Sequence, residues 1–313
     1  MQIHHGIEQL SLLRPVVTIG SFDGVHRGHV QVIRSLNAFA AETGGESAIL
    51  SFDPHPREVL YPLEKRPGIL TTLPEKAALL TGYGVDHLVL LHFTRELADM
   101  NYADFIRRIL VDKIGLKGWV VGYDHRFGKN REGNFDAVQE LAGRYDFSIR
   151  REDACTAGDV QISSTKIRTA LERGEISLAN EMLGYDYPLS GTVVHGDQLG
   201  RRIGFPTANL QTDDERKQLP ALGVYAVKAV VDGVEYKGLL NIGVRPTVCY
   251  SGEIRPEVHL LDFAGSLYGK QLVVRLVSRL RQEQRFAGLD DLSRQLAKDE
   301  QQARSWFARN GAV

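Results

Sequence analysis

Hydrophobic positions in the first half of the chain form short, nearly uninterrupted runs that alternate with helical patterns. Runs such as 88–91 and 119–121 are typical of parallel strands covered by helices on both faces. The expected strands are 16–19, 48–52, 87–92 and 118–122, and the expected helices are 30–41, 75–81, 102–114 and 137–144. This alternation predicts a doubly wound α/β domain, whose ligands bind beyond the carboxyl ends of the strands.

After Tyr185 the pattern changes to strand-like runs with little helix between them, which predicts a small antiparallel β-barrel. The expected strands are 191–194, 223–231, 236–242, 258–263 and 271–277. Asp232-Gly233 between two of them is a strong hairpin signal. A final helix packed on the barrel is predicted by apolar positions at helical spacing, namely Leu289, Leu292, Leu296, Ala303, Trp306 and Phe307. We therefore expect two domains, 1–185 and 186–313.

Composition narrows the classes of protein without indicating a chemistry. Lys and Arg number 38 against 39 Asp and Glu, so the near-neutral charge disfavours a nucleic-acid partner. No apolar run of about 20 residues occurs and the first residues lack a signal-peptide pattern, so we expect a cytoplasmic protein without a membrane partner. Cys155 and Cys249 lie far apart, which favours two free thiols over a zinc or disulfide framework.

The first candidate site is the segment 19–29, which leaves a strand and opens a helix. Gly20 and Gly24 allow a ligand to approach the backbone closely. His26 and His29 are three residues apart, so they share one face at the positive end of the helix, where an anion is favoured. Taken alone, this segment is more typical of an ordinary turn with two surface histidines, and no third residue at a diagnostic spacing indicates a metal site.

A second helix start with free hydroxyls follows at 162–168. Ser163, Ser164 and Thr165 can cap that helix, and Arg168 adds a positive charge. By itself the segment indicates only a helix cap. Two anion-binding helix starts in one α/β domain favour a nucleotide ligand.

These segments together resemble the HxGH nucleotidyltransferase superfamily, which transfers AMP from ATP. The strings GSFDGVHRGH (20–29), SFDPHP (51–56) and GYDHRFG (122–128) narrow the resemblance. They are similar to the N-terminal half of the prokaryotic bifunctional riboflavin kinase/FMN adenylyltransferases, also called FAD synthetases.

In the second half, the segment 191–210 joins a strand to a glycine-rich loop that can wrap around phosphates. Thr207 and Asn209 offer hard oxygen ligands that suit Mg²⁺, although a barrel corner without a ligand would fit the composition as well. The string GFPTANL (204–210), followed by NIGVRPT (241–247) and PEVHLLDF (256–263), resembles the riboflavin kinase module of the same family.

The resemblance implies a role for each matching residue. ATP-binding residues are implied at Gly20, Phe22, Asp23, Gly24, Ser163, Ser164 and Thr165 in the first half, and at Gly200, Arg201, Gly204, Thr207 and Asn209 in the second. Flavin-binding residues are implied at Asp53, His55, Pro56, Asp124, Phe127, Asn241 and Arg245. Catalytic roles are implied for His26, His29, Arg168 and Glu257, with Mg²⁺ held together with ATP by Thr207 and Asn209.

The implied activity converts riboflavin to FMN and then FMN to FAD, with one ATP for each step. Two departures from the family pattern bear on flavin affinity: His125 stands where a phenylalanine is expected, and the loop 248–256 differs from the expected glycine-rich run. Two alternatives stay open. One is a nucleotidyltransferase for another substrate, such as phosphopantetheine, with a regulatory barrel, and the other is a flavin-binding module without turnover.

Overall fold

The structure is a computed structural model that describes residues 1–63, 66–122, 135–153, 155–157, 160–195, 204–244 and 254–310. The chain divides into two compact units, Met1–Ser164 and Thr165–Val313. The division falls between the first two residues of helix α7 (Ser164–Arg173), upstream of the 185/186 boundary expected from the sequence.

The first unit is built on a parallel six-stranded sheet in the order β1-β4-β3-β2-β5-β6. Its strands are β1 (Gln2–His5), β2 (Val16–Ile19), β3 (Ser47–Asp53), β4 (His87–His92), β5 (Gly118–Val121) and β6 (Ser148–Arg151). From β2 the chain runs outward through β3 and β4, then returns to place β5 on the other side of β2. The crevice at the carboxyl ends of β2 and β5 is therefore the switch point where such sheets bind ligands.

Helices connect these strands: α1 (Arg27–Thr43), α2 (Pro56–Leu60), α3 (Leu73–Gly82), α4 (Arg95–Asp99), α5 (Tyr102–Asp104) and α6 (Phe135–Tyr145). The helix expected over 102–114 is one turn of α-helix followed by a π-helical segment, η2 (Phe105–Ile114). A short hairpin, β7 (Thr156–Ala157) and β8 (Val160–Gln161), precedes α7. Helix α1 ends at Gly44, whose φ of 60° places it in the left-handed region that favours glycine.

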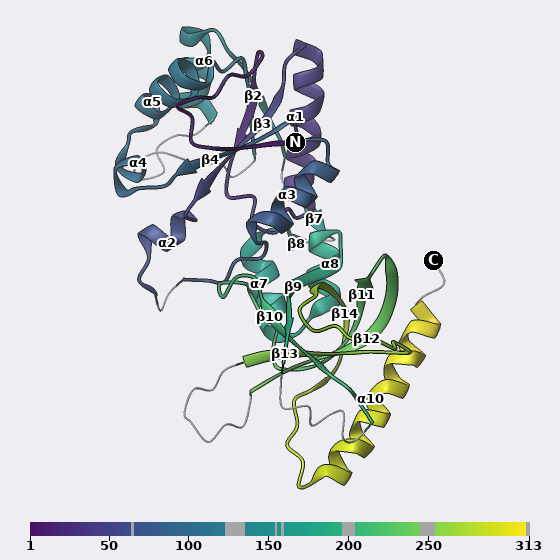
Figure 1. Ribbon diagram of the computed structural model, residues 1–313. Helices are drawn as coiled ribbons and strands as arrows, with labels where there is room; N and C mark the ends of the chain where they lie inside the picture. Colours follow the sequence, from purple (N-terminus) through teal and green to yellow (C-terminus); the bar gives the residue numbers. More distant parts are fainter. Residues whose placement is uncertain are drawn as a thin grey trace. The chain divides into compact units, whose positions relative to one another are not determined.

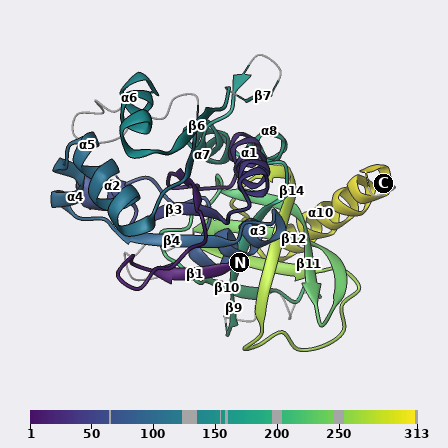
Figure 2. The same cartoon turned by 90° about the horizontal axis from the view of Figure 1, so that it is seen from above.

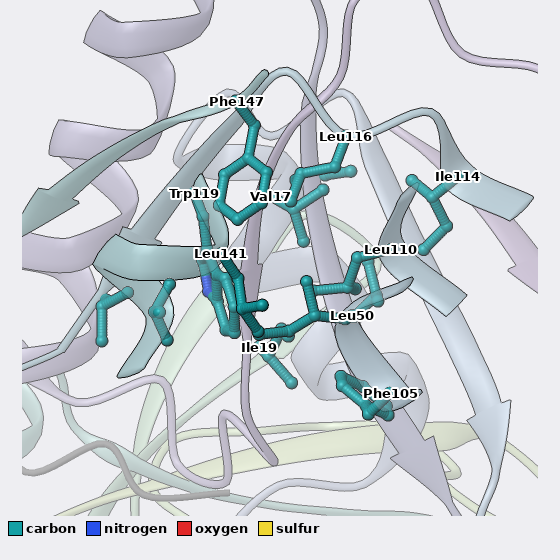
Figure 3. Packing of buried hydrophobic residues seen from close by; sticks show 14 of the residues in the cluster. Val17, Ile19, Leu50, Phe105, Leu110, Ile114, Leu116, Trp119, Leu141 and Phe147 are labelled. Carbon is teal, nitrogen blue, oxygen red and sulfur yellow. The ribbon is translucent and has the colours of Figure 1, made fainter. Parts of the chain in front are cut away.

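Both faces of the sheet are buried, which confirms the doubly wound architecture. Alternate residues of β2 belong to different clusters: Val17 packs with Trp119 and Leu110, whereas Val16 packs with Ile33 of α1. Figure 3 shows the first cluster, in which Leu141 of α6 lies beside Trp119 and Leu110 of η2 lies nearer to Leu50. In Figure 1, α1 and α3 lie on one side of the sheet and α5 and α6 on the other.

The second unit is a closed antiparallel barrel in the order β10-β13-β12-β11-β14-β9, as the strand-rich pattern predicts. Its elements after α7 are α8 (Ile176–Leu183), β9 (Tyr187–Val194), β10 (Ala208–Thr212), β11 (Gly223–Val231), β12 (Val234–Val244), β13 (Ile254–Leu260), β14 (Gln271–Gln282) and α10 (Leu289–Asn310). The strand expected at 258–263 begins earlier and ends at Leu260, because Asp262 adopts a left-handed turn conformation (φ 58°).

Two local predictions in the barrel unit are confirmed. Asp232 and Gly233 form the hairpin turn with φ values of 51° and 82°. Helix α10 runs alongside β11, β12 and β14 (Figures 1 and 2), where Ala303 and Phe307 pack into a buried cluster. Arg281 of β14 adds a polar anchor through a bidentate ion pair with the fully buried Asp299, with Nη2 to Oδ2 at 2.7 Å.

Across the described ranges, no helix has both the length and the apolar character that crossing a membrane would need.

Candidate active sites

The turn between β2 and α1 lies at the switch point and has an unusual backbone. Phe22, Gly24 and Val25 all have positive φ values, of 47°, 85° and 35°. For a residue other than glycine this conformation costs about 1–3 kcal/mol and persists only where the surrounding structure enforces it. Such strain is typical of segments shaped for binding.

The contacts that hold this turn come from two distant segments. Asp23 Oδ1 accepts hydrogen bonds from the backbone N–H groups of Leu70 (2.8 Å) and Thr71 (3.1 Å). Thr71 Oγ1 accepts one from Gly24 N (3.0 Å), and Ser164 Oγ donates to the Asp23 carbonyl (2.9 Å). The first residue of α7 therefore meets the β2–α1 turn, and the Asp23 carboxylate helps to shape that turn.

The two histidines of the turn are stacked against each other. Their ring centroids lie 3.6 Å apart with 13° between the planes. His26 is the N-cap of α1, and its Nδ1 accepts a hydrogen bond from His29 N (3.3 Å). A Cβ at Gly28 would lie 3.3 Å from the His26 ring, which explains the glycine of the HxGH pattern. Because Nδ1 of His26 is an acceptor, the proton of the neutral ring is on Nε2.

His29 is electrically different from an exposed histidine. Burial, followed by the His26 ring and the ammonium of Lys76, holds the pKa of His29 well below its usual value of 6.5. Its Nδ1 is buried and has no hydrogen-bond partner among the described residues. Near neutral pH the ring is thus uncharged, and it can serve a ligand by hydrogen bonding rather than as a cation.

The other residues expected at this site fall into three groups. Phe22 is buried with its ring 4.8 Å from that of His29. Ser163 precedes α7, whereas Thr165 (exposed) and Arg168 (buried) lie on α7 in the second unit. Asp124, Phe127 and the divergent His125 lie outside the described residues.

A cavity of about 530 Å³ opens at the carboxyl ends of β1, β3 and β4. Of the expected flavin-binding residues that the structure describes, Asp53 lines this cavity, whereas His55 caps α2 by accepting from Arg57 N (3.1 Å) and Pro56 starts that helix. Sequence reasoning missed the polar side chains that complete the wall, which are His5, Glu8, His92, Thr94 and Glu96. His5, Asp53 and His92 are each the last residue of a strand. That shared position is the signal that could have found them.

The barrel carries a second group of predicted residues on three neighbouring strands. Asn209 of β10 pairs with Glu257 of β13, and Glu257 pairs in turn with Asn241 of β12. Directly paired residues of neighbouring strands point to the same face of a sheet. Val258 and Leu240, one residue away in the register, are buried on the opposite face. The register thus places three predicted site residues in one row.

Oxygen atoms in this row fit a divalent cation bound with a nucleotide. Thr207 Oγ1 donates to Glu257 Oε2 at 3.4 Å. Asn209 Oδ1 is buried and has no hydrogen-bond partner among the described residues, so it has a lone pair to offer. Hydroxyl, amide and carboxylate oxygens are the ligands that Mg²⁺ takes, usually with phosphate oxygens and water. The described residues hold no cluster of three or more His, Cys, Asp or Glu side chains suited to a resident metal.

The glycine-rich segment before this row is described only in part. Gly204 adopts a left-handed conformation (φ 83°), which supports its predicted place in a tight loop. His259 Nδ1 lies 2.8 Å from the Pro206 carbonyl and ties the segment to β13. Gly200, Arg201 and Arg245, together with 248–253 of the divergent loop, lie outside the described residues.

Together, the stacked-histidine turn on a doubly wound sheet and the oxygen-rich row on a closed barrel define a two-unit transferase of the nucleotide-using class. The FAD synthetase family model matches residues 9–166, and the riboflavin kinase family model matches residues 183–307. The chain belongs to the family of bifunctional riboflavin kinase/FMN adenylyltransferases.

Two relatives of that name illustrate the match. The protein of Pseudomonas fluorescens is 41% identical over 313 residues, and that of Escherichia coli (strain K12) is 42% identical over 311 residues. The alignments cover 98% of this chain and 98% of each relative. A crystal structure from Streptococcus pneumoniae, described as a macrolide-efflux protein, is 30% identical with a TM-score of 0.87, covering 97% of this chain and 99% of its own. That description differs from those of both family models and of the two relatives above.

Proposed function

We propose that this chain phosphorylates riboflavin to FMN at the barrel and then adenylylates FMN to FAD at the β2–α1 turn. The observation that carries the proposal is that each unit gathers polar residues of its own family motif into one place. The stacked pair His26 and His29 belongs to the first unit, and the row of Asn209, Glu257 and Asn241 belongs to the second. We assign the adenylyltransferase to 1–185 and the kinase to 186–313.

In the kinase step, the Glu257 carboxylate accepts the proton of the ribityl 5′-hydroxyl as that oxygen attacks the γ-phosphorus of ATP. ADP leaves, and FMN carries the new phosphate. Thr207 and Asn209 hold the nucleotide with Mg²⁺, which when bound neutralises phosphate charge. Phosphoryl transfer depends mainly on this positioning and neutralisation. The hydrogen bond between Thr207 and Glu257 supports the assignment, because it keeps the base and the nucleotide ligand within reach of one another. We also assign flavin binding to Asn241 and Arg245.

In the second step, an oxygen of the FMN phosphate attacks the α-phosphorus of a second ATP, and pyrophosphate leaves. His26 and His29 donate hydrogen bonds to the α-phosphate oxygens, where negative charge grows in the transition state. Ser163, Ser164, Thr165 and Arg168 hold the departing β- and γ-phosphates. No covalent enzyme intermediate is needed, since nucleophile and leaving group both belong to the substrates.

We place the FMN ring in the cavity that Asp53 lines. Its volume of about 530 Å³ falls within the ordinary range for small-molecule sites, and its apolar floor includes Leu91, Leu97 and Met100. Lys76 interacts electrostatically with both Asp53, which lines the cavity, and His29 of the turn. Because both steps consume ATP, we place the enzyme in the cytoplasm.

The test is chromatography of flavins after the protein is incubated with ATP and Mg²⁺, starting from riboflavin in one reaction and from FMN in another. We expect FMN followed by FAD in the first reaction and FAD in the second. Removing Mg²⁺ with a chelator should stop FMN formation. Thr207→Ala should stop the kinase while adenylylation of supplied FMN continues.

Three outcomes would change the proposal. FMN without FAD would leave the first unit with another substrate, and phosphopantetheine would be tried next. Tight flavin binding without any ATP-dependent product would favour a sensor. FMN formation undiminished in the Thr207 variant would refute the placement of the kinase site.

A further inference from the structure

Lys76 of α3 is a buried lysine directly beneath the β2–α1 turn. Its side chain is almost wholly inaccessible to solvent, and its Nζ donates to the Ser21 carbonyl at 2.8 Å. Ser51 Oγ of β3 donates to the same carbonyl at 3.3 Å. A lysine is rarely buried unless its charge is paired, so this position calls for a physical reason.

Helix α3, which carries Lys76, has a capped N-terminus. Thr72 and Glu75 form a capping box, in which Thr72 N donates to Glu75 Oε2 (2.9 Å) and Glu75 N donates to Thr72 Oγ1 (3.4 Å). The residues just before it, Leu70 and Thr71, are those that bind the Asp23 carboxylate. The segment 70–76 therefore binds the turn at two points, the Asp23 carboxylate and, through Lys76, the Ser21 carbonyl.

Two carboxylates and one histidine interact electrostatically with Lys76. Asp23 of the turn and Asp53 at the end of β3 favour its ammonium form and partly offset burial, which is the main cause that lowers the pKa of Lys76. The ammonium is one of the causes, after burial and His26, that hold down the pKa of His29.

We propose that Lys76 is a positioning residue for adenylyl transfer, which fixes the strained turn through the Ser21 carbonyl and faces His29 with a buried positive charge. This inference rests on the proposed adenylyltransferase function. Because its ammonium is already hydrogen-bonded to the Ser21 carbonyl, Lys76 does not contact the substrate. It acts on the reaction through the two histidines. Its charge keeps a second proton off the stacked rings, so that His29 stays in the uncharged form that can donate to a phosphate oxygen near neutral pH.

The test compares Lys76→Met, which removes the donor and the charge, with Lys76→Gln, which keeps an amide donor, and Lys76→Arg, which keeps both. FAD formation from supplied FMN is measured across pH. Misplacing a reacting group by about 1 Å can cost about 10²-fold in rate, and we expect a loss of that order in kcat for the Met variant, with substantial recovery only for Arg. In the Met and Gln variants the acid limb of the pH profile should move to higher pH, because His29 becomes easier to protonate.

Two control variants and two control measurements accompany this test. Ser51→Ala removes a neutral donor to the same carbonyl, so it should leave the pH profile in place. Lys217→Met removes a buried lysine of the second unit, which lies 4.6 Å from the Tyr187 ring centroid, and should not affect FAD formation. FMN formation from riboflavin reports in each variant whether the barrel unit is intact, the circular dichroism spectrum reports whether the first unit keeps its fold, and wild-type FAD formation tests the proposed function itself. The inference is overturned if the Met variant keeps kcat within about threefold of wild type, or if its pH profile superimposes on that of the wild type.

Discussion

Replacing His29 by alanine tests most directly how the β2–α1 turn works. The substitution removes a half-buried imidazole whose ring centroid lies 3.6 Å from that of His26. It keeps the backbone N–H of residue 29, which is the group that donates to His26 Nδ1. The N-cap of α1 therefore survives, and the effect on rate reports the lost imidazole rather than a displaced helix.

The expected magnitude follows from the role of a preorganised donor in the transition state. Removing one such donor typically lowers kcat by about 10²–10³, or about 2.7–4 kcal/mol. We expect FAD formation by His29→Ala to fall within that range, and His29→Asn, which retains an amide donor, to lose less. The loss should lie mainly in kcat rather than in KM for FMN, because charge on the α-phosphate grows only as the reaction proceeds.

The assay is FAD formation from supplied FMN under saturating ATP, with FMN formation from riboflavin measured in the same preparation. Kinase activity should stay within about twofold of wild type, because the barrel carries its own site. A parallel fall in both activities with an unchanged circular dichroism spectrum would refute the two-site reasoning. Retention of FAD formation within about threefold would show that His29 contributes no donor to the transition state.

The same histidine makes a prediction for stability against pH. In the folded chain the pKa of His29 is well below 6.5, while in the unfolded chain it returns to about 6.5. Just below pH 6.5 the unfolded chain therefore binds more protons, so the contribution is fully present above that pH and declines as pH falls through it. The urea midpoint of the wild type should drop between about pH 7.5 and about pH 5.5. His29→Ala should lack that part of the drop, and an identical pH dependence in both proteins would contradict the assignment.

Three further substitutions probe the geometry elsewhere. Glu257→Gln should lower FMN formation by about 10²-fold or more while FAD formation from supplied FMN continues, and normal FMN production would remove this carboxylate from the mechanism. Gly28→Ala should impair adenylylation by pressing a methyl group against His26, whereas Gly143→Ala on α6, where a Cβ meets nothing within 4 Å, should not; equal behaviour of the two would contradict the packing argument. Asp299→Ala should destabilise the barrel unit by about 3–5 kcal/mol, as measured by urea unfolding, because it leaves a largely buried arginine of β14 without its counter-charge, and a change below about 1 kcal/mol would show that water replaces the pair.

Sequence pattern predicted the architecture wherever burial dictates the residues. Strands β2 and β4 follow their apolar runs, because a parallel strand covered on both faces has no polar side to interrupt the pattern. Strand β10 escaped prediction because its polar residues, among them Asn209, break the apolar run, and Asn209 faces the candidate site. At β13 the apolar run continues past the strand, because Leu261 packs in the cluster under α10 and Phe263 packs on Tyr236.

In the candidate sites, too, the sequence pattern predicted some residues and missed others. The motifs around His26 and Thr207 could be located in the sequence because their residues are contiguous. The groups that hold those residues in place are distant in the sequence. Lys76 lies 55 positions beyond the carbonyl it binds, and Thr71 lies 47 positions beyond Gly24. No local periodicity in the sequence links such distant residues, because only the tertiary fold brings them together. The cavity wall likewise draws on the ends of three strands that are far apart in the chain.

Closure of the barrel has a consequence for how its chemistry can diversify. Asn209, Glu257 and Asn241 are held by the register of three adjacent strands in a sheet that has no free edge. One strand can slide past its neighbours only if the whole ring changes its stagger, so the spacing between these three side chains is stiff. Loops at the mouth of the barrel bear no such constraint. They can be lengthened, shortened or exchanged while the row of Asn209, Glu257 and Asn241 stays in register.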